Sequence, residues 1–202
     1  EERVLDDTWG YDAEAVVSPL GDRMVFTSTR SNDLELWTCD LDSKNLFQVT
    51  DAPGYDGGAF FSPDSEQIVW RASRPEGEDA DRYRDLLTRN AVEPGELNLF
   101  VANADGSDAR QVTDLPGANW APFFHPDGQR IIFSSNHASE SGRLFNLYMI
   151  NMDGSGLKQI THDPEFASFP MFSKDGKRLV FSANRNNGGD RSTNVFIAEW
   201  ID

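Results

Sequence analysis

Residues 62–70, with the sequence SPDSEQIVW, decide the fold, because they join a tight turn to a short apolar strand and the chain repeats this combination. Pro63 sets the backbone angle that a β-turn needs, and Asp64 tolerates the bend. Matching tetrapeptides begin at Ser18, Ser62, His125 and Ser173. Eight residues after each start, an aromatic residue lies in a β-rich run: Phe26, Trp70, Phe133 and Phe181. The chain therefore contains four copies of one structural unit.

Further positions recur at fixed distances from the start of each turn. Eleven residues before it stand Asp7, Asp51, Asp114 and His162, and twelve residues after it stand Arg30, Arg74, His137 and Arg185. Each unit reads as four short strands, a to d, which in the first unit lie at about 13–17, 23–28, 34–39 and 46–50. The four starts are 44, 63 and 48 residues apart. A period of about 40–50 residues is typical of propeller blades.

The turn, the apolar strand that ends in Ser-x-x-Arg or a similar sequence, and the later Gln-Val-Thr segment together resemble the TolB-like propeller repeat, a relative of the WD type. The resemblance covers essentially the whole chain outside residues 75–95. It implies an all-β fold, namely a β-propeller of four-stranded antiparallel blades, with four blade repeats forming a single domain over residues 1–202. It also implies a periplasmic or extracellular location.

The two ends of the chain complement each other in this repeat. The last unit reaches its third strand at about 194–199, whereas residues 2–6 look like a spare fourth strand. We expect residues 2–6 to pair with 194–199 and close the ring, because an open blade edge invites wrong pairing. The alternative is that the four units belong to a larger propeller with further blades before Glu1.

The charge balance disfavours several classes of partner. Lys and Arg total 18 residues against 34 Asp and Glu, a formal net charge of −16. This balance argues against a nucleic-acid-binding surface and against docking on anionic lipid. Cys39 is the single cysteine of the sequence, so the chain forms no disulfide within itself. No apolar run approaches the length of about 18 residues needed to span a bilayer.

The sequence carries no recognisable catalytic signature, such as a Gly-x-Ser-x-Gly elbow, a His-Glu-x-x-His helix or a phosphate-binding glycine loop. We therefore expect a non-catalytic binding or scaffold module, without a cofactor, that recognises a protein, a peptide or a carbohydrate. Two alternatives stay open. One is a propeller enzyme, a lyase or hydrolase that uses a metal or works without one, and the other is the regulatory propeller of a peptidase.

The d–a and b–c connections of a propeller emerge on one face, and loops of this kind carry most binding sites. We expect a ligand to contact this face near the central axis. The residues expected to bind it are Arg30, Asp56, Arg74, Asn119, Trp120, His137, His162 and Arg185. Because arginine forks suit carboxylates, an anionic ligand is the natural expectation. The alternative is that each arginine pairs with a carboxylate of a d–a loop and locks the blades.

Two histidines of this face raise the question of a metal. His137 and His162 could ligate one together with nearby acids such as Asp114, Asp163 or Glu165. Ordinary polar loop histidines are the commoner case, so we assign no metal.

Residues 75–95 interrupt the second unit, where 30 residues separate Trp70 from Phe100. Residues 78–89 predict a short amphipathic helix, because acidic residues open it and its apolar side chains fall on one side. These apolar residues are Tyr83, Leu86 and Leu87. The helix either packs on the rim of the propeller or covers a ligand.

Overall fold

The computed structural model describes residues 10–201 except 94, 163–165 and 191. The described residues form four antiparallel sheets, each built from consecutive strands. We call these sheets blades 1 to 4. Blade 1 holds β1 (Asp12–Val17), β2 (Arg23–Ser28), β3 (Glu35–Asp40) and β4 (Phe47–Gln48), and blade 2 holds β5 (Asp56–Phe61), β6 (Gln67–Ala72), β7 (Asn98–Asn103) and β8 (Arg110–Gln111). Blade 3 holds β9 (Asn119–Phe124), β10 (Arg130–Ser135), β11 (Asn146–Asn151) and β12 (Lys158–Gln159), and blade 4 holds β13 (Ala167–Phe172), β14 (Arg178–Ala183) and β15 (Asn194–Glu199).

The repeated turn fixes the first hairpin of every blade. In blade 2 the backbone N–H of Ser62 donates to the Gln67 carbonyl at 2.8 Å, while the Ser62 hydroxyl donates to Asp64 at 2.5 Å. His125 replaces this serine in blade 3, and its Nδ1 accepts the N–H of Asp127 at 3.2 Å. A side chain that bonds the backbone two residues on is the reason why such residues favour turns.

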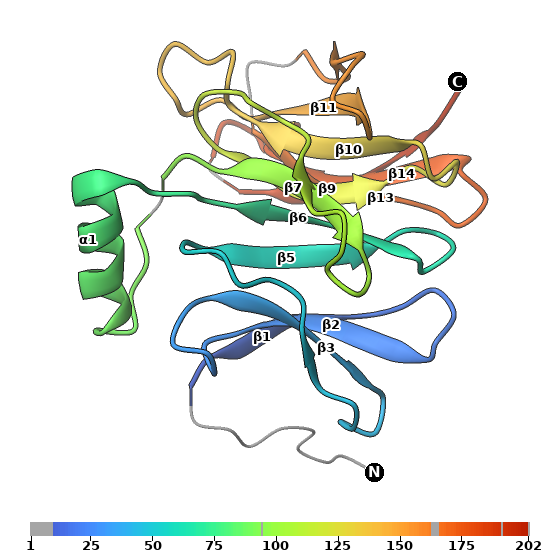
Figure 1. Ribbon diagram of the computed structural model, residues 1–202. Coiled ribbons are helices and arrows are strands. Elements are labelled where there is room, and N and C mark those ends of the chain that lie inside the picture. Colours follow the sequence, from blue (N-terminus) through green and yellow to red (C-terminus); the bar gives the residue numbers. More distant parts are fainter. Residues whose placement is uncertain (1–9, 94, 163–165, 191, 202) are drawn as a thin grey trace.

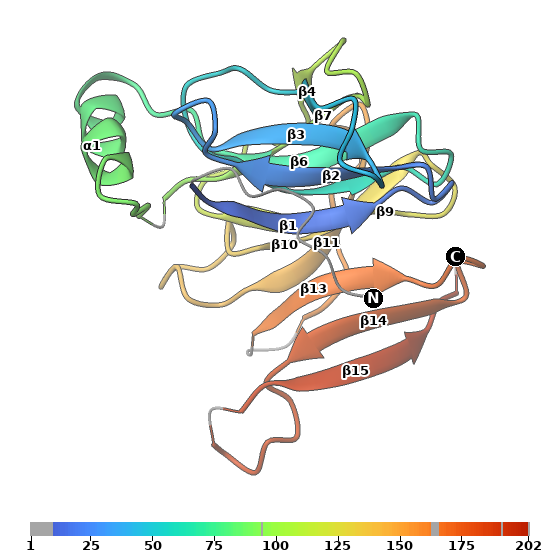
Figure 2. The same ribbon diagram turned by 90° about the horizontal axis from the view of Figure 1, so that it is seen from below.

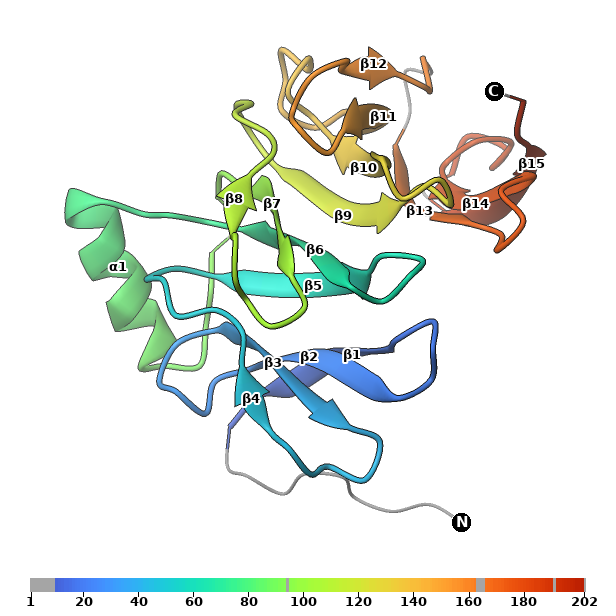
Figure 3. The ribbon, with the colours of Figure 1, turned by 45° about the vertical axis from the view of Figure 1, so that its right-hand side comes forward.

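The aromatic residues of the repeat set the register between the middle strands. The second and third strands pair Phe26 with Trp37, Trp70 with Phe100, Phe133 with Tyr148, and Phe181 with Phe196. In blades 1 to 3 a two-residue fourth strand follows, as Figure 3 shows for β4, β8 and β12. The sheets and their register confirm the predicted propeller blades.

Every innermost strand contains a β-bulge, which the sequence did not predict. The register of β1, β5, β9 and β13 shifts in each case at the same point of the repeat. The residues there have left-handed backbone angles: Glu14 (φ 57°), Gly58 (φ 62°), Ala121 (φ 50°) and Phe169 (φ 55°). A bulge of this kind bends the strand and redirects its side chains.

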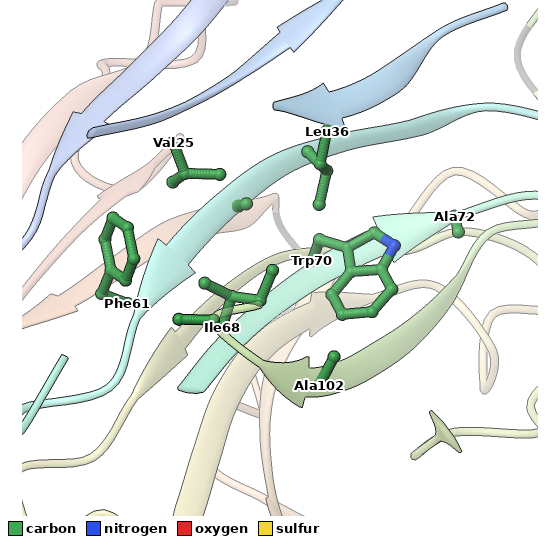
Figure 4. Close-up of a cluster of buried hydrophobic side chains, with 9 residues drawn as sticks. Val25, Leu36, Phe61, Ile68, Trp70, Ala72 and Ala102 are labelled. Atoms are coloured by element: carbon green, nitrogen blue, oxygen red, sulfur yellow. The ribbon is translucent and has the colours of Figure 1, made fainter. Parts of the chain in front are cut away.

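The hydrophobic core lies between successive blades. Figure 4 shows the layer between blades 1 and 2, where Val25 and Leu36 face Phe61, Ile68 and Trp70. Two further buried clusters repeat this arrangement between blades 2 and 3 and between blades 3 and 4. Burial of a Leu or Ile side chain contributes about 1.5–3 kcal/mol, so these layers hold the blades together.

The four blades follow one another in space as they do in the chain. Among the described residues, β1 contacts β5, β5 contacts β9 and β9 contacts β13, whereas β1 and β13 do not touch. In Figure 3 these strands accordingly follow one another in the order β1, β5, β9 and β13. In Figure 2, β15 forms the outer edge of the three-stranded blade 4. The predicted closing strand, residues 2–6, lies outside the described residues.

The predicted helix is present as α1 (Gly77–Leu87). Figure 1 shows it beside one end of the blade 2 strands, on the face where β6 leads into β7. None of its described residues is buried. Within the described ranges, no helix is long and apolar enough to cross a membrane.

Candidate functional site

Arg30, which the repeat places at the end of a b strand, is held inside blade 1. Its guanidinium donates to Asp12 at 2.8 Å and lies over the rings of Phe26 and Trp37, 5.0 and 5.2 Å from their centroids. The side chain is 7% exposed. Arg30 therefore joins the start of β1 to the middle strands of its own blade.

Arg74 occupies the equivalent position in blade 2 and makes a bidentate ion pair with Asp56, at 2.8 and 2.9 Å. Asp56 is fully buried and also accepts the indole N–H of Trp70. Burial raises the pKa of Asp56 to about 6, although the Arg74 hydrogen bonds oppose the shift. The guanidinium of Arg74 lies over Phe100 at 4.9 Å. Its side chain stays 31% exposed, so one side of it reaches the surface.

Blades 3 and 4 vary the same arrangement. His137 replaces the arginine in blade 3, and its Nδ1 lies 2.9 Å from the Ser135 hydroxyl, which donates to Asn119. In blade 4, Arg185 lies over the Phe181 ring at 5.1 Å. Ala167 of blade 4 takes the place of the buried acid, because it pairs across the hairpin as Asp56 does in blade 2.

The other two predicted site residues lie in different surroundings. Trp120 of β9 packs edge-on against Phe145 and Phe169, at 5.7 and 5.0 Å. His162 is exposed and lines a shallow cavity with Arg130 and Trp200. The structure thus distributes the eight predicted residues over four blades. In the ranges that it describes, no group of three or more His, Cys, Asp or Glu side chains is placed to hold a metal ion.

A cavity of about 790 Å³ lies between α1 and blade 2, and we call it the α1 pocket. Tyr83, Leu86, Val92 and Phe100 give it apolar walls. Its charged lining residues are Arg71, Arg74, Arg82, Glu76, Asp79, Glu93 and Glu96. The pocket opens on the predicted binding face because α1 belongs to the b–c connection of blade 2. Of the eight predicted site residues, Arg74 is the one that lines it.

Polar contacts hold α1 in place above this pocket. The Tyr83 hydroxyl donates to Asp33 of the blade 1 b–c connection at 2.5 Å. Burial and the neighbouring Asp33 carboxylate both raise the pKa of Tyr83, so this hydroxyl remains a donor. Arg82 and Glu93 form an ion pair at 2.8 Å between α1 and the segment that returns to β7. These contacts therefore tie the helix to the blade 1 connection and to the segment that returns to β7, although it buries no residue fully.

Tyr55, which directly precedes β5, and Arg71 of β6 also line the pocket. Arg71 donates to Glu14 of blade 1 at 2.5 Å and to the Tyr55 hydroxyl at 2.6 Å. Glu14 also accepts the backbone N–H of Gly58 at 2.8 Å. Burial alone would raise the pKa of Glu14, but Arg71 and these hydrogen bonds lower it below its usual value. The charged pair therefore bridges blades 1 and 2 in its ionised form.

Sequence reasoning missed Glu14 and Arg71, although a signal was present. Arg71 stands nine residues after the start of its turn, where the other blades have Thr27, Ser134 and Ser182. Gly58 stands four residues before the start, where the other blades have Glu14, Ala121 and Phe169. When one strand carries a large side chain and the neighbouring strand has a glycine at the facing position, the large side chain can occupy the space that the glycine leaves empty.

A buried acid lies at the start of β3, close to the groups that hold α1. Glu35 is 2% exposed, and one of its carboxylate oxygens has no hydrogen-bond partner in the described structure. Burial raises the pKa of Glu35 to about 8, and the nearby charges of Asp56 and Asp33 add to the shift. Glu35 is therefore a neutral acid at neutral pH.

One group of similar proteins consists of TolB propellers. A family model described as the TolB beta propeller domain matches residues 85–193. The TolB homolog of Chlorobium chlorochromatii is 25% identical over 142 residues, which cover 58% of this chain and 32% of that protein. The structure of a putative TolB from Agrobacterium tumefaciens superposes with a TM-score of 0.73 at 18% identity, over 96% of this chain and 64% of that one. At this identity the superposition shows the fold alone.

A second group of relatives consists of peptidases. Dipeptidyl-peptidase 5 of Porphyromonas gingivalis is 36% identical over 75 residues, which cover 37% of this chain and 9% of the relative. The chain spans about a third of the length of the TolB homolog and far less of this peptidase.

Proposed function

Because the chain belongs to the TolB β-propeller domain family, we propose that it is a non-catalytic binding module that recognises a protein or peptide segment in the α1 pocket. One observation carries the proposal. The repeated polar residues of blades 1 and 2 are occupied by contacts within their own blades, whereas the non-repeated α1 segment adds a cavity to the face where loops carry function. We place the module in the periplasm or outside the cell on the same family resemblance.

The size and lining of the α1 pocket suit this role. Binding pockets for small ligands or side chains measure about 300–1,000 Å³ and combine apolar walls with a few placed polar groups. The α1 pocket, at about 790 Å³, has Leu86, Val92 and Phe100 as walls and the exposed side of Arg74 among its polar groups. It therefore has room for one or two side chains of an extended peptide.

Blade 1 offers a matched control for the proposal. Its b–c connection has Ser31, Asn32 and Asp33 between Arg30 and Leu34, where blade 2 has residues 75–96 between Arg74 and Leu97. In the graft variant, Ser-Asn-Asp replaces residues 75–96. This replacement removes α1 and the pocket but keeps the Arg74–Asp56 pair. The variant should stay folded, because no helix residue is fully buried and the bond from Tyr83 to the Asp33 carboxylate contributes only about 1.5–3 kcal/mol.

The test selects peptides from a random displayed library on the wild-type protein and measures each by fluorescence anisotropy on both proteins. We expect selected peptides to bind the wild type and to lose at least about tenfold in affinity on the graft variant, a difference of about 1.4 kcal/mol. Peptides that bind both proteins equally, with circular dichroism confirming that the graft variant is folded, would refute the α1 pocket as the binding site.

The second candidate function is the propeller of a peptidase, and the match to dipeptidyl-peptidase 5 favours it. In that case the binding face would serve an adjoining hydrolase domain. The native reading frame distinguishes the two candidates, because a peptidase requires a hydrolase domain in the same chain.

A further inference from the structure

The arginines of the α1 pocket are already matched by carboxylates. The pairs are Arg71 with Glu14, Arg74 with Asp56 and Arg82 with Glu93, at 2.5, 2.8 and 2.8 Å. A guanidinium that forks onto a carboxylate has its strongest donors and its charge engaged. A carboxylate ligand of Arg74 or Arg71 would have to displace Asp56 or Glu14, both of which are held by further hydrogen bonds, and a ligand of Arg82 would compete with Glu93. The pocket is therefore poorly equipped for an anion.

Carboxylates remain in excess around the same pocket. Glu76 and Glu96 line it and are exposed, and neither forms an ion pair in the part of the chain that the structure describes. Asp79 also lines the pocket. The pKa of Arg82 is raised mainly by its contact with Glu93, and the charge of Asp79 adds to this shift. The formal charge of the whole chain, −16, has the same sign. A cation approaching this face therefore meets attraction at short and long range.

The walls beside these carboxylates are apolar and aromatic. Leu86 and Val92 offer aliphatic surface, and Tyr83 and Phe100 offer ring surface. Lysine and arginine side chains combine a long aliphatic stem with a charged head, so they bury the stem against apolar groups and leave the head near acids. Aromatic faces add a favourable contact with the cation.

We infer that the α1 pocket takes a lysine or arginine side chain of the bound peptide, with its stem against Leu86 and Val92 and its cationic head toward Glu76 and Glu96. This inference rests on the proposed function. It differs from the anionic ligand expected from Arg30, Arg74 and Arg185, because Arg74, the one of these three that lines the pocket, is paired with Asp56.

The inference is tested with two small probes, n-butylguanidinium and butyrate, titrated into the ¹⁵N-labelled full chain and followed by NMR. We expect n-butylguanidinium to shift the amide signals of Tyr83, Leu86 and Phe100, while butyrate leaves them in place. Neutralising the pocket by Glu76→Gln with Glu96→Gln should weaken the guanidinium about threefold to tenfold, the range for two exposed charge pairs.

The matched control for this charge change is Glu140→Gln with Glu199→Gln, which removes two exposed acids of blades 3 and 4. It alters the net charge equally and should leave the affinity for n-butylguanidinium within about twofold, because screening limits the reach of exposed charges. Equal losses in both double variants, or preferential binding of butyrate, would overturn the inference.

The displayed peptides separate this inference from the proposed function. If selected peptides need α1 but bind unchanged after each Lys is replaced by norleucine and each Arg by citrulline, the pocket binds peptides and the inference is wrong. If no peptide distinguishes the wild type from the graft variant, the proposed function fails and the inference fails with it. A loss of at least about tenfold on replacing one Lys or Arg supports both.

Discussion

Gly58→Ala is the sharpest test of how blades 1 and 2 are joined. Gly58 lies at the bulge of β5 with φ +62°, and the guanidinium of Arg71 fills the space beside it. A Cβ at this position would lie 1.8 Å from Nη1 and 2.8 Å from Cζ of Arg71. Even a methyl group therefore displaces the guanidinium from Glu14.

The cost of Gly58→Ala has two parts. An alanine in the left-handed region costs about 1 kcal/mol. This conformation is tolerated in the fold, since Ala121 adopts φ 50° at the same position of blade 3. Loss of the Arg71 hydrogen bond to Glu14, a carboxylate that is 28% exposed, adds about 1–3 kcal/mol. We expect the free energy of unfolding to fall by about 2–4 kcal/mol in total.

The assay is urea unfolding of a double-mutant cycle with Arg71→Met. If displacement of the guanidinium is the main cost, Gly58→Ala should cost about 1 kcal/mol in the Arg71→Met background, where the guanidinium is absent. The control Ala121→Gly should change stability by less than about 1 kcal/mol, because relief of strain and greater freedom of the unfolded chain oppose each other. Equal costs of Gly58→Ala in both backgrounds would refute the role assigned to Arg71.

Three further predictions concern the charged groups. Arg74→Met should lower the free energy of unfolding by about 3 kcal/mol, because it removes the ionic partner of the buried Asp56. In thermal denaturation, Arg185→Met should cost less than half as much, because blade 4 has Ala167 in the place of Asp56, and equal losses would contradict this. Glu35 has its pKa raised from 4.5 to about 8, so its contribution to stability is fully present below pH 4.5 and is lost as the pH rises toward 8. In urea unfolding, the free energy of unfolding of Glu35→Gln should therefore rise relative to that of the wild type between pH 5 and pH 8. Parallel pH profiles of the two proteins would exclude the raised pKa of Glu35. Raising NaCl from about 10 to about 150 mM should increase the Tm, because it screens the repulsion within a chain of charge −16; a Tm that falls would show that attractive pairs outweigh the repulsion.

The blade architecture could be read from the chain because its causes are local. A Pro or Asp at a turn such as 62–65, and aromatic residues at a constant distance from it, act within one hairpin and recur four times. The residues that sit opposite one another in the strands, such as Phe26 and Trp37, follow from these distances. Helix α1 was also visible in the sequence, since its apolar spacing and acidic start lie within one segment.

The roles of the polar residues depended on contacts that sequence distances leave open. Arg30 and Arg74 stand at corresponding positions, which is compatible with a shared binding mouth and equally with arginines that pair with d–a loop carboxylates and lock the blades together. The structure shows both arginines paired with a carboxylate of their own blade, because the antiparallel pairing of the first two strands puts the start of one beside the end of the other, as in Asp12 opposite Ser28. Ligand contact through these residues stays a prediction.

The α1 pocket and the bridge between Arg71 and Glu14 arise between segments that are far apart in the chain. Arg71 and Glu14 are 57 residues apart, and they meet because Gly58 leaves a space between two blades. The pocket exists because the side chains of α1 fill the space above blade 2 incompletely, and no local pattern records how well two surfaces fit. Local hydrogen bonding and strand alternation therefore suffice to predict the blades, while the shape and charge of the site follow from how the blades and the helix pack together.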